Sequence, residues 1–101
     1  MDEILLFLVD DAFQIKDRGC ILVPGVSTEP GSPTVRVGTC IRLVTPTGES
    51  IHTSVKGLEM LNFGAQRPDR VTAPILLPKE LSKEMIPKGT KVFLASPENQ
   101  Q

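Results

Sequence analysis

The stretch AFQIKDRGCILVPGV, residues 12–26, decides the fold that the sequence predicts. Phe13 and Ile15 alternate with polar residues, and this period of two places the apolar pair on one face of a strand. The dipeptide Arg18-Gly19 interrupts the alternation before a second apolar run, and glycine adopts a positive φ at little cost. We therefore predict two strands that pair across a tight turn or bulge.

Residues 35–51, VRVGTCIRLVTPTGESI, extend this pattern. Val35, Val37 and the apolar residues after them suit strands that are interrupted at Gly38. The segment Pro46-Thr47-Gly48-Glu49 predicts a hairpin, because proline favours the second position of a turn and glycine accepts its left-handed one. The next strand is expected at residues 50–55, with an extended path through residue 60.

The last third of the chain also consists of short apolar runs that end at turn residues. Residues 73–77 predict a buried strand that Pro78 ends, and residues 91–95 predict the closing strand. Between them, residues 79–86 favour one or two helical turns, with Leu81 and Met85 four residues apart on a shared face.

Size and composition agree with one β-rich domain. The chain has 101 residues, of which 40 % are hydrophobic and 23 % charged, so it falls in the range of globular proteins. Roughly six to eight short strands with regular turn signals indicate a sandwich or a small barrel rather than a βα repeat. We expect residues 1–95 to form a single domain and residues 96–101 to be a frayed polar tail.

The order of these pieces, continued by VKGLEM at residues 55–60, resembles the second domain of translation GTPases such as elongation factor Tu. The closing pieces PILLP (74–78), KELSKEMIPKG (79–89) and TKVFLA (90–95) are similar as well. The resemblance spans nearly all of residues 9–95. It implies an all-β fold, namely a small closed β-barrel of the translation-protein type with one short helical turn near residues 79–86.

Two departures from that family bear on function. No GxxxxGK[ST] loop is present, so GTP hydrolysis is not expected. Pro74 stands where the family barrels usually keep a glycine-rich turn and a paired strand. This puts in doubt any inherited contact with a neighbouring domain or with the acceptor end of tRNA.

Charge bears on whether the chain binds RNA. The net charge is −1, but residues 13–72 hold seven cations against five anions, which leaves room for a local basic patch. An evenly solvated surface is the competing interpretation. The candidate contacts for RNA or another partner are six cations: Lys16, Arg18, Arg42, Lys56, Arg67 and Arg70.

Candidate catalytic residues are few. His52 is the single histidine, and in a strand its side chain points away from those of Ile51 and Thr53. Cys20 and Cys40 are interpreted as buried thiols rather than nucleophiles, a disulfide or a zinc site. Asp10 and Asp11 are adjacent on a strand and therefore point apart. The sequence thus predicts a protein that is not an enzyme and that has no cofactor and no metal.

The remaining hypotheses concern partners. The first is a non-catalytic interaction module that binds a protein partner or itself through the loops at residues 27–34 and 62–70. The alternative is a protein that binds tRNA or the ribosome. The apolar run Ile4–Val9 is expected to be a buried strand, although it could instead complete a sheet across chains. We expect a cytoplasmic protein that contacts neither membrane nor DNA.

Overall fold

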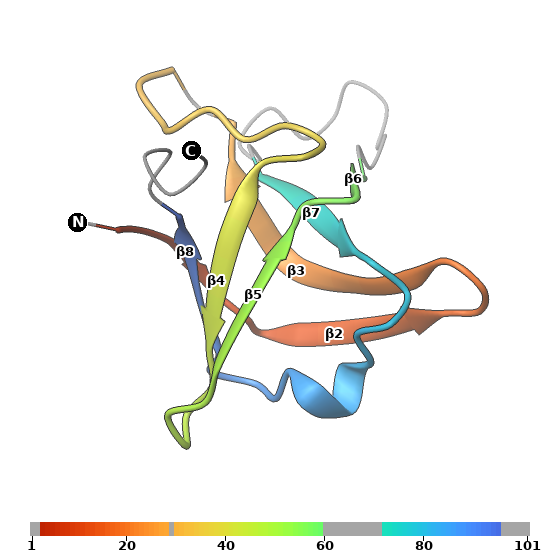
Figure 1. The fold of residues 1–101 in the computed structure, drawn as a ribbon. Coiled ribbons are helices and arrows are strands. Elements are labelled where there is room, and N and C mark those ends of the chain that lie inside the picture. Colours follow the sequence, from red (N-terminus) through yellow and green to blue (C-terminus); the bar gives the residue numbers. More distant parts are fainter. Residues whose placement is uncertain (1–2, 29, 60–71, 96–101) are drawn as a thin grey trace.

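The computed structural model describes residues 3–28, 30–59 and 72–95, and over these ranges the chain is all-β apart from one short 3₁₀ helix. The strands form two antiparallel four-stranded sheets (Figure 1). The elements are β1 (Ile4–Leu8), β2 (Asp11–Ile15), β3 (Gly19–Ser27), β4 (Cys40–Val44), β5 (Ser50–Ser54), β6 (Gly57–Leu58), β7 (Thr72–Leu77), the helix η1 (Lys83–Met85) and β8 (Lys91–Leu94).

The first sheet has the order β1-β8-β4-β5 and the second the order β2-β3-β7-β6. Two segments pass from one sheet to the other. The Val9 N–H donates to the Thr90 carbonyl beside β8 at 2.9 Å, and the next N–H, of Asp10, donates to Val23 of β3 at 2.8 Å. The β1–β2 segment therefore belongs to both sheets.

The β5–β6 segment also crosses from the first sheet to the second. The Val55 N–H donates to the Thr39 carbonyl beside β4 at 2.9 Å, and the Lys56 N–H donates to Leu76 of β7 at 2.8 Å. Consecutive residues are thus bonded to different sheets. β1 and β5 are the two edge strands of the first sheet. The two crossing segments therefore connect the sheets at opposite edges.

The core lies between the inner faces of the sheets. Ile41, Leu43 and Val92 of the first sheet, and Leu22 and Ile75 of the second, are completely buried. Burial of each such side chain stabilises the fold by about 1.5–3 kcal/mol. In β1 a bulge between Leu5 and Phe7 allows two successive residues, Leu6 and Phe7, to pack against this core.

Two glycines of β3 lie against the backbone of β7. A Cβ atom on Gly19 (φ 133°) would stand 2.1 Å from the Leu77 carbonyl oxygen, and one on Gly25 (φ 103°) would stand 2.1 Å from that of Ala73. Only glycine fits at either position. The turn predicted before Gly19 is confirmed, and the Arg18 N–H donates to Ile15 across it at 3.0 Å.

Most of the predicted strands are present, and Phe13 and Ile15 share a face as expected. That face is the outer one, since Phe13 is 49 % exposed. The reason is the pairing of β2, which sets Ala12 opposite the buried Leu22. Alternation shows which residues share a face of a strand, whereas the neighbouring strand decides which face is buried.

Two expectations were wrong. Val35 and Val37 lie outside any strand, because residues 36–39 form a turn in which the Arg36 N–H donates to the Thr39 hydroxyl at 2.9 Å. Leu81 and Met85 do not share a buried face, since the helix is a single 3₁₀ turn that begins after Leu81 and leaves Met85 exposed.

The N-terminal run pairs within the chain. β1 is hydrogen-bonded to β8 in antiparallel register, and Val9 is buried. Ile4, Leu5 and Leu8 are nevertheless each about half exposed, so only part of the run is covered. Within the described ranges no helix has the length and apolar character that a membrane crossing would need.

Candidate functional site

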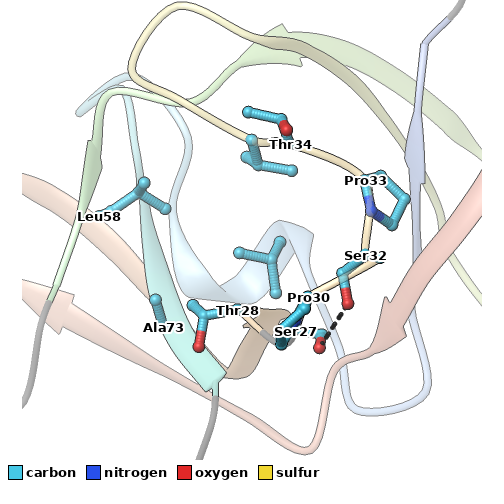
Figure 2. A pocket seen from close by; sticks show the side chains of 11 residues that line it. Ser27, Thr28, Pro30, Ser32, Pro33, Thr34, Leu58 and Ala73 are labelled. Carbon is cyan, nitrogen blue, oxygen red and sulfur yellow. Dashed lines mark hydrogen bonds between the residues drawn. The ribbon is translucent and has the colours of Figure 1, made fainter.

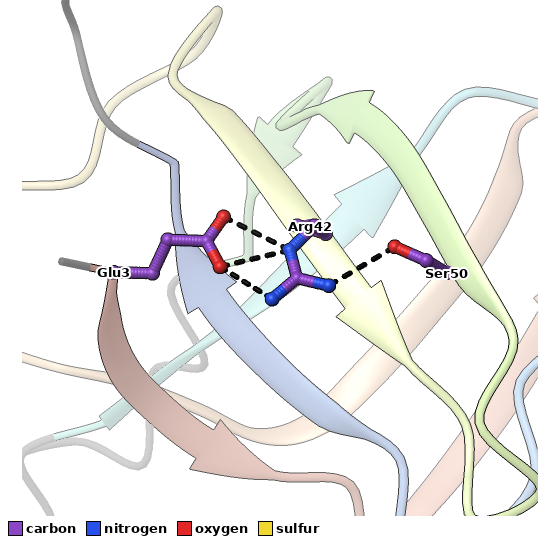
Figure 3. Close-up of polar contacts among 3 residues, drawn as sticks. All are labelled: Glu3, Arg42 and Ser50. Carbon is purple, nitrogen blue, oxygen red and sulfur yellow. Dashed lines mark hydrogen bonds and ion pairs between the residues drawn. The ribbon is translucent and has the colours of Figure 1, made fainter. Parts of the chain in front are cut away.

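Among the predicted contact residues that the structure describes, Arg42 makes the most hydrogen bonds. It lies on the outer face of the first sheet, where its guanidinium donates to both carboxylate oxygens of Glu3, at 2.8 and 2.9 Å from Nε (Figure 3). A further donation from Nη2 to Oε1 of Glu3 completes a two-pronged ion pair. The Nη1 atom donates to the Ser50 hydroxyl at 3.1 Å.

Phe93 and Glu3 both stabilise the positive charge of the Arg42 guanidinium. The guanidinium carbon lies 5.3 Å from the centre of the Phe93 ring, within the range of a cation–π contact. The hydrogen bonds from Arg42 hold the pKa of the Glu3 carboxyl below its ordinary value, and the same bonds raise the pKa of Arg42. The positive charge of Arg42 is therefore already neutralised within the chain.

Arg18 has a weaker partner. Its Nη2 atom lies 3.3 Å from the Glu59 carboxylate, and the pair links the β2–β3 turn to the residue that follows β6. Lys16 and Lys56 are exposed, and within the described part of the chain no carboxylate forms an ion pair with either. Arg67 and Arg70 lie outside the described residues.

The four predicted cations that the structure describes do not gather into one cluster. Arg42 stands on the first sheet, whereas Lys16 and Arg18 occupy the β2–β3 turn of the second. Lys56 follows β5 at the passage between the sheets. Asp17 and Glu59 accompany the cations of the second sheet, so positive and negative charges alternate there. This arrangement is typical of a solvated surface rather than of a phosphate-binding groove.

The loop after β3 forms one wall of a pocket of about 360 Å³. Ser27, Thr28, Ser32 and Thr34 supply hydroxyl groups, Ala73 lies beside Thr28, and Leu58 lies across the pocket from Ser32 (Figure 2). The Ser32 hydroxyl donates to that of Ser27 at 2.8 Å. The loop at residues 27–34 was predicted to be a binding loop, and the pocket beside it is lined by both apolar and hydroxyl-bearing side chains. The other predicted loop, at residues 62–70, lies outside the described residues.

The residues that could carry catalysis are separated. Cys20 lies on the inner face of the second sheet, where burial raises the pKa of its thiol and disfavours the reactive thiolate. Cys40 is a half-buried free thiol on β4 of the first sheet, so the two cysteines are not on neighbouring strands. His52 is exposed and stands opposite Arg42. Within the described ranges no three metal-ligating side chains come together.

Two features of the surface were not recognised in the sequence. Glu3 is 39 residues from Arg42, and no pattern connects them before β1, β8 and β4 are placed side by side. The second feature is a pair of half-exposed apolar side chains on the outer face of β1, which we name the β1 patch: Leu5 and Leu8. The bulge in β1 turns Leu5 and Leu8 outward while Phe7 stays in the core.

Comparison of the chain with models of protein families, with curated proteins and with solved structures gave no match. The function is therefore argued from the geometry alone.

Proposed function

We propose that this chain is a non-catalytic interaction module built on a closed β-barrel of the translation-factor type. The barrel is supported by the two segments that pass between the sheets, since hydrogen bonds at Val9–Asp10 and at Val55–Lys56 link the sheet edges. A sheet whose edges are joined in this way has few unpaired backbone groups. The order of the family-like segments along residues 9–95 supports the type.

The observation that carries the interaction role is the β1 patch. Its two large apolar side chains, Leu5 and Leu8, are each about half exposed, although their strand is well paired with β8. Contiguous apolar exposure on a folded domain marks a surface that binds other macromolecules. The module would act without cofactor or metal, bind through β1, and present the hydroxyl-lined pocket as a further contact.

The experiment is a pull-down from the native host with the tagged chain, divided into samples with and without RNase. The informative variant is Leu5→Thr/Leu8→Thr, which keeps residues that favour strands. Val37→Thr is the matched control, because Val37 is more exposed than either leucine and lies in a loop. A protein partner that survives RNase and is lost only with the β1 variant supports the proposal. Retention by the β1 variant contradicts it.

An RNA-linked role, in which the chain binds tRNA or the ribosome, is the second candidate. It is favoured by Lys16 and Lys56, which are exposed and make no ion pair with the described carboxylates. If two cations contact phosphates, the logarithm of the affinity should fall against the logarithm of salt with a slope of about −1.4 to −1.8. A slope near zero in a titration with tRNA would exclude this role.

A further inference from the structure

The β1 patch continues onto β8, the strand beside it. Leu5 stands opposite Phe93, and Leu8 stands opposite Lys91. Val92, between these two β8 residues, is completely buried, so alternation places Phe93 and Lys91 on the outer face with the two leucines. Residues directly opposite on one face have Cβ atoms about 4.5–5.5 Å apart. The patch therefore has one apolar neighbour, Phe93, and one charged neighbour, Lys91.

The charge on this face is positive. The four strands of the first sheet contain two cations, Arg42 and Lys91, and no aspartate or glutamate. Glu3, which precedes β1, reaches over the sheet and neutralises Arg42 (Figure 3). Lys91 is exposed and forms no ion pair with any described residue. An uncompensated positive charge therefore lies directly beside Leu8.

We infer that the partner of the β1 patch is a protein segment that carries an acidic side chain next to an apolar one. The apolar group contacts Leu5, Leu8 and Phe93, and the carboxylate pairs with Lys91. A basic segment is disfavoured, because like charges across an interface suppress the wrong partner. The inference rests on the proposed function, since it names the chemistry of the partner that the module binds.

Glu3 gives the inference a second and opposite consequence. Its carboxylate already occupies Arg42, which stands opposite Phe93 on the next strand. An acidic partner on the same face is repelled by Glu3 and attracted by Lys91. Replacing Glu3 with a neutral side chain of similar shape leaves Arg42 as a second available cation. Substitutions at Lys91 and at Glu3 should therefore change the affinity in opposite directions.

The test is a nuclear magnetic resonance titration of the full chain with two short synthetic peptides. Both peptides carry the same leucines, which are flanked by glutamates in one and by lysines in the other. The glutamate peptide should bind roughly tenfold more tightly and shift the amide signals of β1 and β8. Lys91→Glu should reverse this preference. Lys16→Glu is the matched control, because Lys16 is equally unpaired but lies at the β2–β3 turn of the other sheet.

The second variant is Glu3→Gln. It should strengthen binding of the glutamate peptide roughly threefold, which is the effect of one additional exposed ion pair. Binding of the lysine peptide should weaken by a similar factor. The dispersion of the amide signals in each variant, before any peptide is added, verifies that the fold is kept.

Three outcomes would overturn the inference: a glutamate peptide that does not bind, equal affinity for the two peptides, and a preference that Lys91→Glu leaves unchanged. The proposed function has its own failure, which is retention of the captured partner by Leu5→Thr/Leu8→Thr. A partner that is lost with that variant but is insensitive to Lys91→Glu would leave the proposed function intact and contradict the inference alone.

Discussion

The two sheets are built from similar short strands but differ in how their charged residues are paired. On the first sheet, Arg42 is held by Glu3, Ser50 and Phe93, so its charge is used within the chain. On the second sheet, Asp10 and Lys16 lie at the two ends of β2, are exposed, and form no ion pair with any described residue. The comparison teaches that a cation counted in the sequence is available to a partner only if the fold leaves it unpaired.

The largest expected effect breaks the second sheet. Gly25→Ala should lower the free energy of unfolding by about 3 kcal/mol or more, because the added Cβ would clash with the backbone of β7 and the positive φ would be strained. Urea unfolding measures the loss. In the first sheet, Gly48→Ala is the control with a similar φ but open space around it, and it should cost only about 1 kcal/mol. Equal losses would mean that β3 and β7 are not in close contact.

The next prediction compares how much the Arg42–Glu3 and Arg18–Glu59 ion pairs contribute to stability. Arg42→Ala should lower the free energy of unfolding by about 1–2 kcal/mol, because it removes a two-pronged ion pair and the contact with Phe93. Arg18→Ala should cost less than about 0.5 kcal/mol, since the Arg18 side chain is 56 % exposed and makes a single contact with Glu59. Thermal unfolding of both variants measures the two effects. A larger loss of stability for Arg18→Ala than for Arg42→Ala would contradict the prediction.

The ion pair on the first sheet also predicts a dependence on pH. The pKa of Glu3 is lower in the folded chain than in the unfolded one, so the stability it contributes is present above the unfolded pKa of about 4.3 and is lost as pH falls through the lower folded value. Glu3→Gln should therefore be less stable than the wild type by about 0.5–1 kcal/mol at pH 7. The difference should nearly vanish well below the folded pKa. Urea titrations at neutral and acid pH test this, and a difference that persists in acid would contradict it.

The smallest effect concerns the exposed apolar residues. Phe13→Thr and Leu5→Thr should each change the free energy of unfolding by less than about 0.5 kcal/mol, because both side chains are about half exposed on strands that threonine suits. Leu22→Ala is the buried control on β3 and should cost about 2–5 kcal/mol. A large loss from Phe13→Thr would mean that Phe13 supports the fold.

Local patterns predicted much of the fold. The turn at Gly19 and the hairpin at Pro46–Gly48 were correct, because a positive φ and a proline ring restrict the backbone whatever lies around it. Which way Phe13 faces could not be predicted, since that depends on β3 and on the core beneath Ala12. The pairing of Arg42 with Glu3 was equally out of reach, because it requires three strands to be placed first.

The pairing of β1 with β8 has a consequence for synthesis of the chain. Ile4 is opposite Leu94, so β1 leaves the ribosome well before its partner strand has been made. Contacts between such distant segments form slowly, because a long loop must close before they contribute. Until β8 emerges, the apolar side of β1 has no sheet to join and is free to meet chaperones or other nascent chains. Completion of the first sheet therefore waits for β8 to be made.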